Sequence, residues 1–270
     1  MAHPPSKHSD LSFQMFFEMS TTNDRSINTP STSSSIKKHL KLDFKEIEAV
    51  GPVLDILSQK MFQNNVDNSS DGSHQKTIYF NADIIHGPGL RNASLSVHSD
   101  EFMKICLQFL KQDLRRQKQC AFSLGWKSDC RSFTGYTKND IKKIKDIIQS
   151  NDLLSCSQGV VLAANARVLV RDPHPFDSIL KEIPEIQLLV WTGTGEPPIS
   201  AGKIKKIKNH FQEINCMHQV GFDCQIAESF LSGLLYDSAV EIAGLLWNAQ
   251  HYLEQKIDSM RYNTKILKNK

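Results

Sequence analysis

The chain has 270 residues, of which 40% are hydrophobic, and it carries 32 lysine and arginine residues against 29 aspartate and glutamate residues. This length allows one large domain or two small ones with a packed core. The net charge of +3 is too small to indicate a nucleic-acid-binding surface, and the composition excludes collagen-like, wholly disordered and multi-span membrane proteins.

The N-terminal region carries two segments that contribute no predicted strand. The first ten residues, MAHPPSKHSD, have neither a basic n-region nor an apolar h-region, so no cleavable signal peptide is expected. Residues 21–38 are rich in Ser, Thr and Asn and have almost no apolar side chains. This composition predicts a low-complexity insertion outside the core.

From residue 39 onward, short apolar runs alternate with segments of helical periodicity. The segment after the first run, KEIEAVGPVLDILSQKMF, has apolar residues at three- and four-residue steps. The predicted helices that follow are 99–117, 138–149, 175–181 and 201–211. The six predicted strands are 39–44, 77–82, 120–124, 159–163, 187–191 and 219–222.

The tail, residues 224–270, has apolar residues spaced like one face of a long amphipathic helix or of a helix pair. Packing against the main domain is one interpretation, and contact with a partner or a membrane surface is the other. No transmembrane segment is expected, because acidic residues interrupt every apolar stretch of about 20 residues. These are Asp223, Glu228, Asp237 and Glu241.

Strands that alternate with helices predict a parallel sheet, because a parallel pair needs a crossover of this length. An open doubly wound sheet and a closed (β/α) barrel both fit this pattern. Polar residues follow nearly every strand, which favours a barrel mouth built from all the βα loops. No Gly-rich phosphate-binding loop follows any strand. The sequence therefore predicts an α/β fold, a TIM-like (β/α) barrel with six visible units over residues 1–223.

The six cysteines are far apart and include no C-x-x-C pair, which predicts buried thiols and disfavours a structural zinc site. Asn68 and Asn92 each begin an N-x-[ST] triplet and are candidate glycosylation sites. Such triplets permit an extracellular location without establishing one.

The first two strands end in pairs of polar residues that an i, i+2 spacing places on one face. Asp43 with Lys45 offers a carboxylate for a hard cation such as Mg²⁺ or Ca²⁺ and an ammonium for a phosphate oxygen. Asn81 with Asp83 forms a second oxygen-bearing pair, in which Asp83 is a candidate metal ligand and Asn81 is a candidate for phosphate or substrate contact. An ordinary interior ion pair explains D-x-K equally well, so both interpretations stay open.

Three further residues are candidates for substrate or proton chemistry. Arg167 could clamp a phosphate with its planar guanidinium, or could pair with Asp43, Asp83 or Asp223 for structural reasons. Trp191 ends the fifth predicted strand and is a candidate for substrate contact. His3 precedes two prolines and could act as an acid or base near neutral pH.

Six motifs resemble the menorin family, which is related to phospholipase-C-like and glycerophosphodiester phosphodiesterase barrels. They are MAHPP, KLDFK, FNADIIHGPG, FSLGW, VVLAANARVLV and LLVWTGTGEPP, in the family's order across about residues 1–223. The insertion at 21–38 and the tail depart from the family pattern. The strands that carry the first histidine motif and the E-A-D motif in family members have no counterpart before MAHPP, so an N-terminally incomplete barrel is expected.

The resemblance implies residue roles at three positions. His3 corresponds to the second catalytic histidine, Asp43 to a metal carboxylate and Lys45 to the adjacent lysine. In the phosphodiesterase relatives, a divalent ion polarises the phosphodiester and paired histidines move protons. Half of that centre has no counterpart here.

Two functions remain open on this evidence. The favoured hypothesis is a non-enzymatic interaction protein, extracellular or at the cell surface, with an unidentified protein partner. The alternative is a phosphodiesterase that uses Mg²⁺ or Ca²⁺ and acts on glycerophosphodiesters or phospholipids. The resemblance favours an extracellular location, with a cytoplasmic one as the alternative.

Overall fold

The computed structural model describes residues 12–22, 39–62, 77–90, 94–193 and 195–268, and the structural statements below concern these ranges. Three sequence-predicted site residues, His3, Asn68 and Asn92, lie outside the described residues. Most of the predicted insertion, residues 23–38, lies outside them as well.

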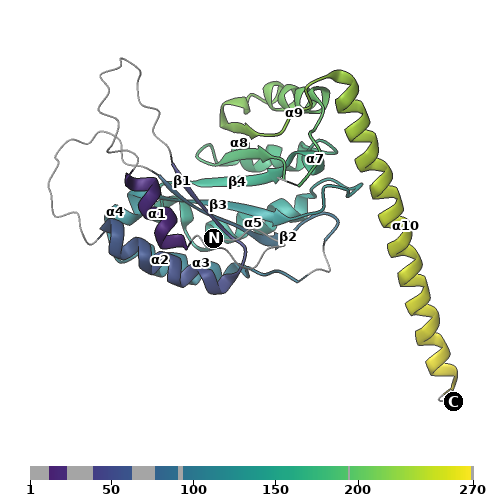
Figure 1. Cartoon of the computed structure of the whole chain (residues 1–270), viewed down its shortest axis with the longest axis horizontal. Coiled ribbons are helices and arrows are strands. Elements are labelled where there is room, and N and C mark those ends of the chain that lie inside the picture. The colour runs from purple at the N-terminus through teal and green to yellow at the C-terminus, as the bar shows by residue number, and fades with distance from the viewer. Residues whose placement is uncertain (1–11, 23–38, 63–76, 91–93, 194, 269–270) are drawn as a thin grey trace.

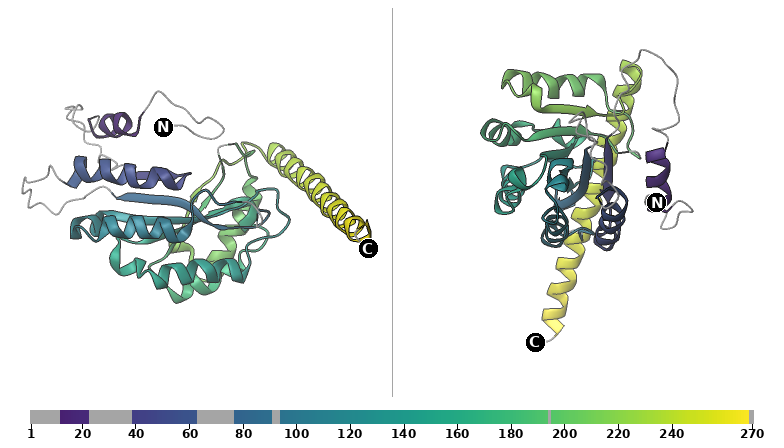
Figure 2. Two further views of the ribbon diagram at one scale, coloured as in Figure 1. Left: turned by 90° about the horizontal axis from the view of Figure 1, so that it is seen from below. Right: turned by 90° about the vertical axis from the view of Figure 1, so that its left-hand side faces the viewer.

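Six parallel strands form one sheet in which every strand pairs with its neighbours in the sequence, in the order β1-β2-β3-β4-β5-β6. The sheet curls into an open half-barrel, with helices along its outer side (Figures 1 and 2). The α/β prediction is confirmed. The described strands do not close into a complete TIM barrel, and their half-barrel is consistent with the incomplete barrel predicted. The strands are β1 (Leu40–Phe44), β2 (Ile78–His86), β3 (Cys120–Lys127), β4 (Val160–Asn165), β5 (Gln187–Trp191) and β6 (Val220–Asp223).

Helices connect the strands, as parallel pairing requires. Short 3₁₀ and π segments extend several of them, at Ile47–Ala49, Ser58–Phe62, His174–Phe176 and Met217–Gln219. The α-helices are α1 (Phe13–Thr22), α2 (Val50–Leu57), α3 (Ser99–Leu110), α4 (Leu114–Gln119), α5 (Lys138–Ser150), α6 (Leu153–Cys156), α7 (Ala166–Leu169), α8 (Asp177–Glu182), α9 (Ala201–Glu213) and α10 (Phe230–Lys268).

The short helices α6 and α7 were not predicted, and the structure departs from the predicted elements in three larger ways. The helix predicted at 99–117 is two helices, because the Asp113 side chain accepts a hydrogen bond from the Arg115 backbone N–H and begins α4. Strand β2 continues to His86, four residues beyond its predicted end. Helix α1 was not predicted, although it buries Phe17 against the core.

Aromatic side chains fill the core between the first three strands and their helices. Phe80 and Phe122 are fully buried, with ring centroids 5.9 Å apart in an edge-to-face arrangement, and Phe102 lies 6.5 Å from Phe122. Each buried phenyl group stabilises the fold by about 1.5–3 kcal/mol. This packing fixes β1, β2 and β3 as one unit, which holds their carboxyl ends in register.

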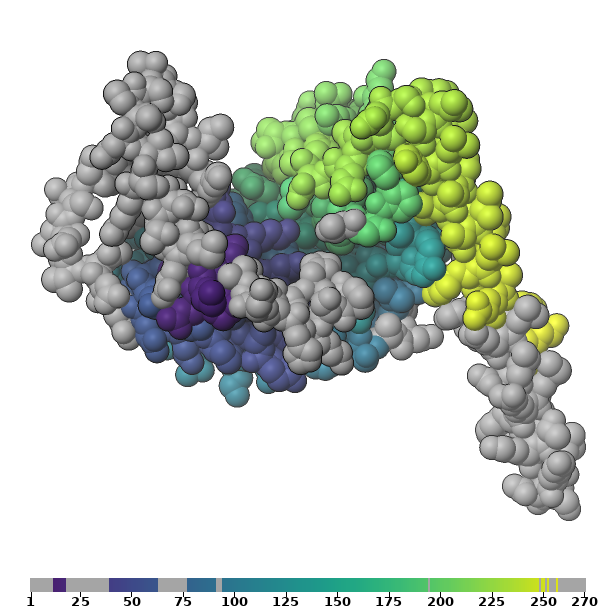
Figure 3. Space-filling model, viewed as in Figure 1, coloured from purple at the N-terminus to yellow at the C-terminus, as the bar shows by residue number. Residues whose placement is uncertain are grey.

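Helix α10 packs on the body through a narrow face of its first half (Figure 3). Small residues bring the helix close: a Cβ at Gly233 would lie 2.9 Å from the Ser200 Cβ, and one at Gly244 would lie 2.5 Å from the Arg131 carbonyl oxygen. Asp237 and Val240 are buried on this face. The prediction of a long helix is confirmed, and its later part projects beyond the body (Figure 1).

The same helix bears on the expected absence of a transmembrane segment. The segment Phe230–Trp247 is long and apolar enough to cross a membrane, by length and composition only. In the structure, 22% of this segment is buried. One such helix is weak evidence for a span, because soluble core helices pass the same test. The structure therefore contains one weakly apolar candidate and no clear transmembrane span among the described residues.

Candidate functional site

Polar side chains meet at one level across the first three strands. Asp43, Asn81 and Ser123 are direct register partners on β1, β2 and β3. The Ser123 hydroxyl donates to Asn81 Oδ1 at 2.6 Å, and Asn81 Nδ2 donates to Asp43 Oδ1 at 2.7 Å. Lys45 Nζ lies 3.0 Å from Asp43 Oδ2. Both carboxylate oxygens of Asp43 are therefore engaged by groups of the chain itself.

Asp83 lies two residues further along β2, beside Gly125 of β3. A Cβ at position 125 would lie 2.5 Å from Asp83 Oδ1, so the glycine makes room for the carboxylate. Burial raises the pKa of Asp83, while the Lys45 ammonium lowers it. The structure thus brings Asp43, Lys45, Asn81 and Asp83 together, and a divalent cation there would compete with Lys45.

A second polar group follows β4 and β5. Asn165 donates its backbone N–H to the Tyr136 hydroxyl at 2.9 Å and its side-chain amide to Glu196 Oε1 at 2.6 Å. Glu196 Oε2 is buried without a hydrogen-bond partner. Burial raises the pKa of Glu196 and, more strongly, the pKa of Tyr136, and both Asp83 and Glu196 act electrostatically on Tyr136. Tyr136 is therefore bonded to the second polar group and lies within electrostatic reach of the first.

A cavity of about 510 Å³ lies between these strand ends and α10. Glu196 and Asp129 line it from the body, and Val240 lines it from the helix. Asp129 is held by Arg131, whose guanidinium donates to both of its oxygens at 2.9 and 2.6 Å. Burial raises the pKa of the Cys130 thiol to about 11, so this cysteine is a protonated thiol at neutral pH. The cavity therefore offers no thiolate nucleophile.

Arg167 does not lie among the strand-end carboxylates. It is in α7, it is 2% exposed, and its Nη1 donates to Asp237 Oδ1 of α10 at 2.8 Å. Its Nη2 donates to the carbonyl oxygens of Pro197 and Pro198 at 2.9 and 2.8 Å. The pairing expected with Asp43, Asp83 or Asp223 is therefore corrected to Asp237, because the short helix α7 turns the side chain toward α10.

Trp191 ends β5, where it is in register with Asn165 and with Asp223. Its side chain is half-buried, and its indole N–H is buried without a hydrogen-bond partner. An unpaired buried donor costs about 1–3 kcal/mol, so a group that accepts a hydrogen bond would be favoured there. Trp191 keeps its role as a candidate for substrate contact.

Tyr136 and Glu196 were missed by the sequence reasoning. Both lie in loops, Glu196 within the TGTGEPP motif that follows β5. Glu196 is the one carboxylate of the loop that follows β5, and that is the signal that could have singled it out. The loop before α5 carries no comparable signal for Tyr136.

The carboxylates at the strand ends do not form a complete metal centre in the described part of the chain. Among the described residues, the ligand atoms of His174, Asp177 and His210 lie close enough together to hold one ion. His174 begins the 3₁₀ segment before α8, Asp177 begins α8, and His210 lies on α9. Asp43 and Asp83 remain candidate ligands for Mg²⁺ or Ca²⁺, and no group of three ligands that includes them is found in the part of the chain that the structure describes.

The fold and its strand-end polar groups define an α/β protein of the half-barrel class, with a candidate site at the carboxyl edge of the sheet. Comparison with known families assigns the chain to one particular family. The Menorin N-terminal domain matches residues 1–222, and the chain belongs to the menorin family. No solved structure matches the chain.

Proposed function

We propose that this chain is a non-enzymatic interaction protein of the menorin family, which binds a protein partner through the outward face of α10. The observation that carries the proposal is a set of large apolar side chains on α10, 41–87% exposed, most of which helical periodicity places away from the docked face. Soluble proteins rarely expose a contiguous apolar patch of this kind unless it binds something. The residues are Phe230, Leu231, Leu234, Leu235, Tyr236, Ile242, Leu245, Leu246 and Tyr252.

The polar strand ends support a binding role over catalysis. Asp43 is engaged by Asn81 and Lys45, and Asp129 is engaged by Arg131. The Cys130 thiol is protonated at neutral pH because burial raises its pKa to about 11. These carboxylates already have partners within the chain, and the cysteine beside them supplies no thiolate.

Site-specific photo-cross-linking tests the proposal. A photoreactive amino acid replaces Leu245 in the full chain, and a second sample carries it in place of Asp55 on the exposed side of α2 as a matched control. We expect a discrete protein adduct from position 245 that is absent from position 55 and is abolished by Leu234→Glu. Adducts to lipid alone, or no adduct from position 245, would overturn the proposal.

A second candidate function, a metal-dependent phosphodiesterase, is favoured by Asp43, Asp83 and Lys45 at adjacent strand ends. Calorimetric titration of Mg²⁺ and Ca²⁺, together with a panel of glycerophosphodiesters, tests it. Saturable metal binding and turnover that both vanish in a folded Asp43→Ala variant would establish this function and overturn the non-enzymatic one.

The extracellular location is proposed from the family resemblance. All six cysteines are free thiols, which favours the cytoplasmic alternative, because oxidising compartments usually pair cysteines. Thiol labelling of the intact cell with a membrane-impermeant maleimide distinguishes the two. Labelling of Cys130 and Cys224 from outside supports the extracellular location, and protection until lysis supports the cytoplasmic one.

A further inference from the structure

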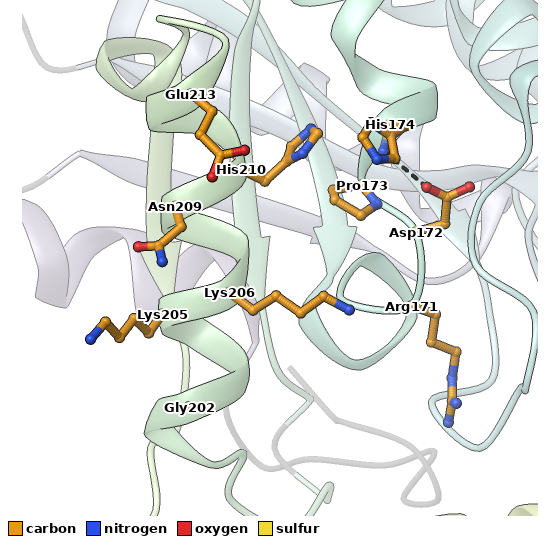
Figure 4. Close-up of a pocket in the computed structure, with 10 residues that line it drawn as sticks. All are labelled: Arg171, Asp172, Pro173, His174, Gly202, Lys205, Lys206, Asn209, His210 and Glu213. Atoms are coloured by element: carbon orange, nitrogen blue, oxygen red, sulfur yellow. Dashed lines mark hydrogen bonds between the residues drawn. The ribbon is translucent and has the colours of Figure 1, made fainter.

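We infer that His174, Asp177 and His210 form a zinc site with one open coordination position, which faces a pocket that fits a small anion. The site lies between α8 and α9, in the outer helical layer (Figure 4). It is independent of the interaction face of α10 and of the strand-end carboxylates.

The three ligand atoms are already close together. His210 Nε2 lies 2.7 Å from Asp177 Oδ1, His174 Nδ1 lies 3.4 Å from Asp177 Oδ2, and all three ligand atoms lie within 4.8 Å of one another. Tetrahedral zinc with bonds of about 2.0–2.1 Å spaces its ligand atoms by roughly 3.3 Å. Small side-chain shifts therefore suffice, and the zinc ion would replace the proton shared between His210 and Asp177.

The surroundings hold one imidazole and leave the other free to adjust. The His210 ring is 10% exposed and packs edge-on against Phe211, with ring centroids 5.1 Å apart. The His174 side chain is 72% exposed, so its ring can turn toward a metal without repacking the core. Its loop is ordered by Pro173 and Pro175, whose φ angles are fixed, and by Asp172, which accepts the His174 backbone N–H at 3.1 Å.

Two histidines and one carboxylate match the ligand set of zinc sites that keep a position open for water or another ligand. The pocket beside them has a volume of about 510 Å³. Arg171 and Lys206 line it, and Figure 4 shows Lys206 extending from α9 toward the loop that carries Arg171. Three cations, Arg171, Lys205 and Lys206, line the pocket against two carboxylates, Asp172 and Glu213. This excess of positive charge beside an open metal position favours an anionic fourth ligand, such as a phosphate or carboxylate oxygen.

A bracing role is the alternative explanation of this cluster. In that case Asp177 only accepts hydrogen bonds from the two imidazoles and fixes α8 to α9. The two explanations predict different metal binding. A purely structural cluster binds no zinc, whereas a zinc site needs all three side chains.

Calorimetric titration of Zn²⁺ into the chelator-treated full chain tests the inference. We expect one high-affinity site, weakened about tenfold or more by His174→Ala or by Asp177→Asn. His174→Ala removes an exposed ring, so the fold is retained even if the buried His210→Ala variant is unstable. His218→Ala removes an exposed histidine outside the cluster and should bind like the wild type. Equal binding by wild type and His174→Ala, or no binding by wild type, would overturn the site.

Cobalt provides a second readout of geometry and of the open position. Co²⁺ in the same site should give the visible absorption of a four-coordinate ion, which His174→Ala abolishes. Inorganic phosphate should shift this spectrum at lower concentration in wild type than in Lys206→Met. A spectrum that phosphate leaves unchanged would overturn the anion-binding part of the inference.

Discussion

Two ion pairs at the carboxyl side of the sheet have similar distances and differ in burial and in sequence separation. Lys45 and Asp43 are 3.0 Å apart, and their side chains are 42% and 41% exposed. Arg167 and Asp237 are 2.8 Å apart, and their side chains are 2% and 9% exposed. Both cations were candidates for phosphate binding. The two pairs therefore differ in burial. The exposed pair leaves the Lys45 ammonium accessible to solvent, and the buried pair holds α10 against the rest of the domain.

Breaking the buried pair should have the largest effect. Arg167→Ala leaves the buried Asp237 carboxylate with Lys203 Nζ, 3.5 Å from Oδ2, as its remaining cation. The free energy of unfolding should therefore fall by about 3 kcal/mol, the lower end for a broken buried pair. Urea unfolding of the full chain measures this loss. The double variant Arg167→Met with Asp237→Leu should recover much of it, because no uncompensated charge remains. A loss below about 1 kcal/mol in Arg167→Ala would contradict the structural role of the pair.

The close packing of α10 against the Arg131 backbone can be tested with a substitution that changes no charged residue. Gly244→Ala puts a Cβ against the Arg131 carbonyl, so the helix must shift, at a cost of about 1–3 kcal/mol. Limited proteolysis between β6 and α10 should become faster. Gly202→Ala is the matched control, since nothing lies within 4 Å of its Cβ on α9, and it should be neutral or stabilising. Equal effects of the two variants would argue against tight packing at Gly244.

The strand-end group predicts a dependence of stability on pH. Burial raises the pKa of Asp83 in the folded chain above its value in the unfolded chain, so the folded state holds the proton more tightly. Its contribution is therefore complete below the unfolded pKa and is lost as pH rises through the folded pKa. Asp83→Asn should remove this loss and stabilise the chain at neutral pH by on the order of 1 kcal/mol.

Chemical unfolding from pH 3 to pH 8 measures that difference. Asp55→Asn, on the exposed side of α2, is the matched control and should follow the wild-type curve. If Asp83→Asn also followed the wild-type curve at every pH, the carboxylate would not be desolvated.

The smallest effect is expected at the exposed pair. Lys45→Met should change the free energy of unfolding by about 0–1 kcal/mol, because exposed ion pairs contribute little. It should nevertheless raise the pKa of Asp83 further, since Lys45 is the main group that lowers it. Carbon-detected NMR titration of the Asp83 carboxyl measures this shift. A stability loss as large as that of Arg167→Ala would remove the distinction between the two pairs.

The local sequence pattern predicted the features that depend on residues close together in the sequence. The alternating elements predicted the sheet, and the polar strand ends brought Asp43 and Asn81 together because parallel strands end at one edge. The helix predicted over 99–117 was wrong at Asp113, because the apolar period continues while this side chain caps a new helix. The partnership of Arg167 with Asp237 spans 70 residues and depends on how α10 docks, which no local pattern encodes.

The sequential order of the sheet has a consequence for synthesis. Because each strand pairs with the one made just before it, the sheet can grow strand by strand as the chain leaves the ribosome. Asp237 is synthesised 70 residues after Arg167, which at about 5–20 residues per second takes roughly 4–14 s. During that interval the nascent sheet carries a guanidinium without its carboxylate, and docking of the last helix completes the buried pair.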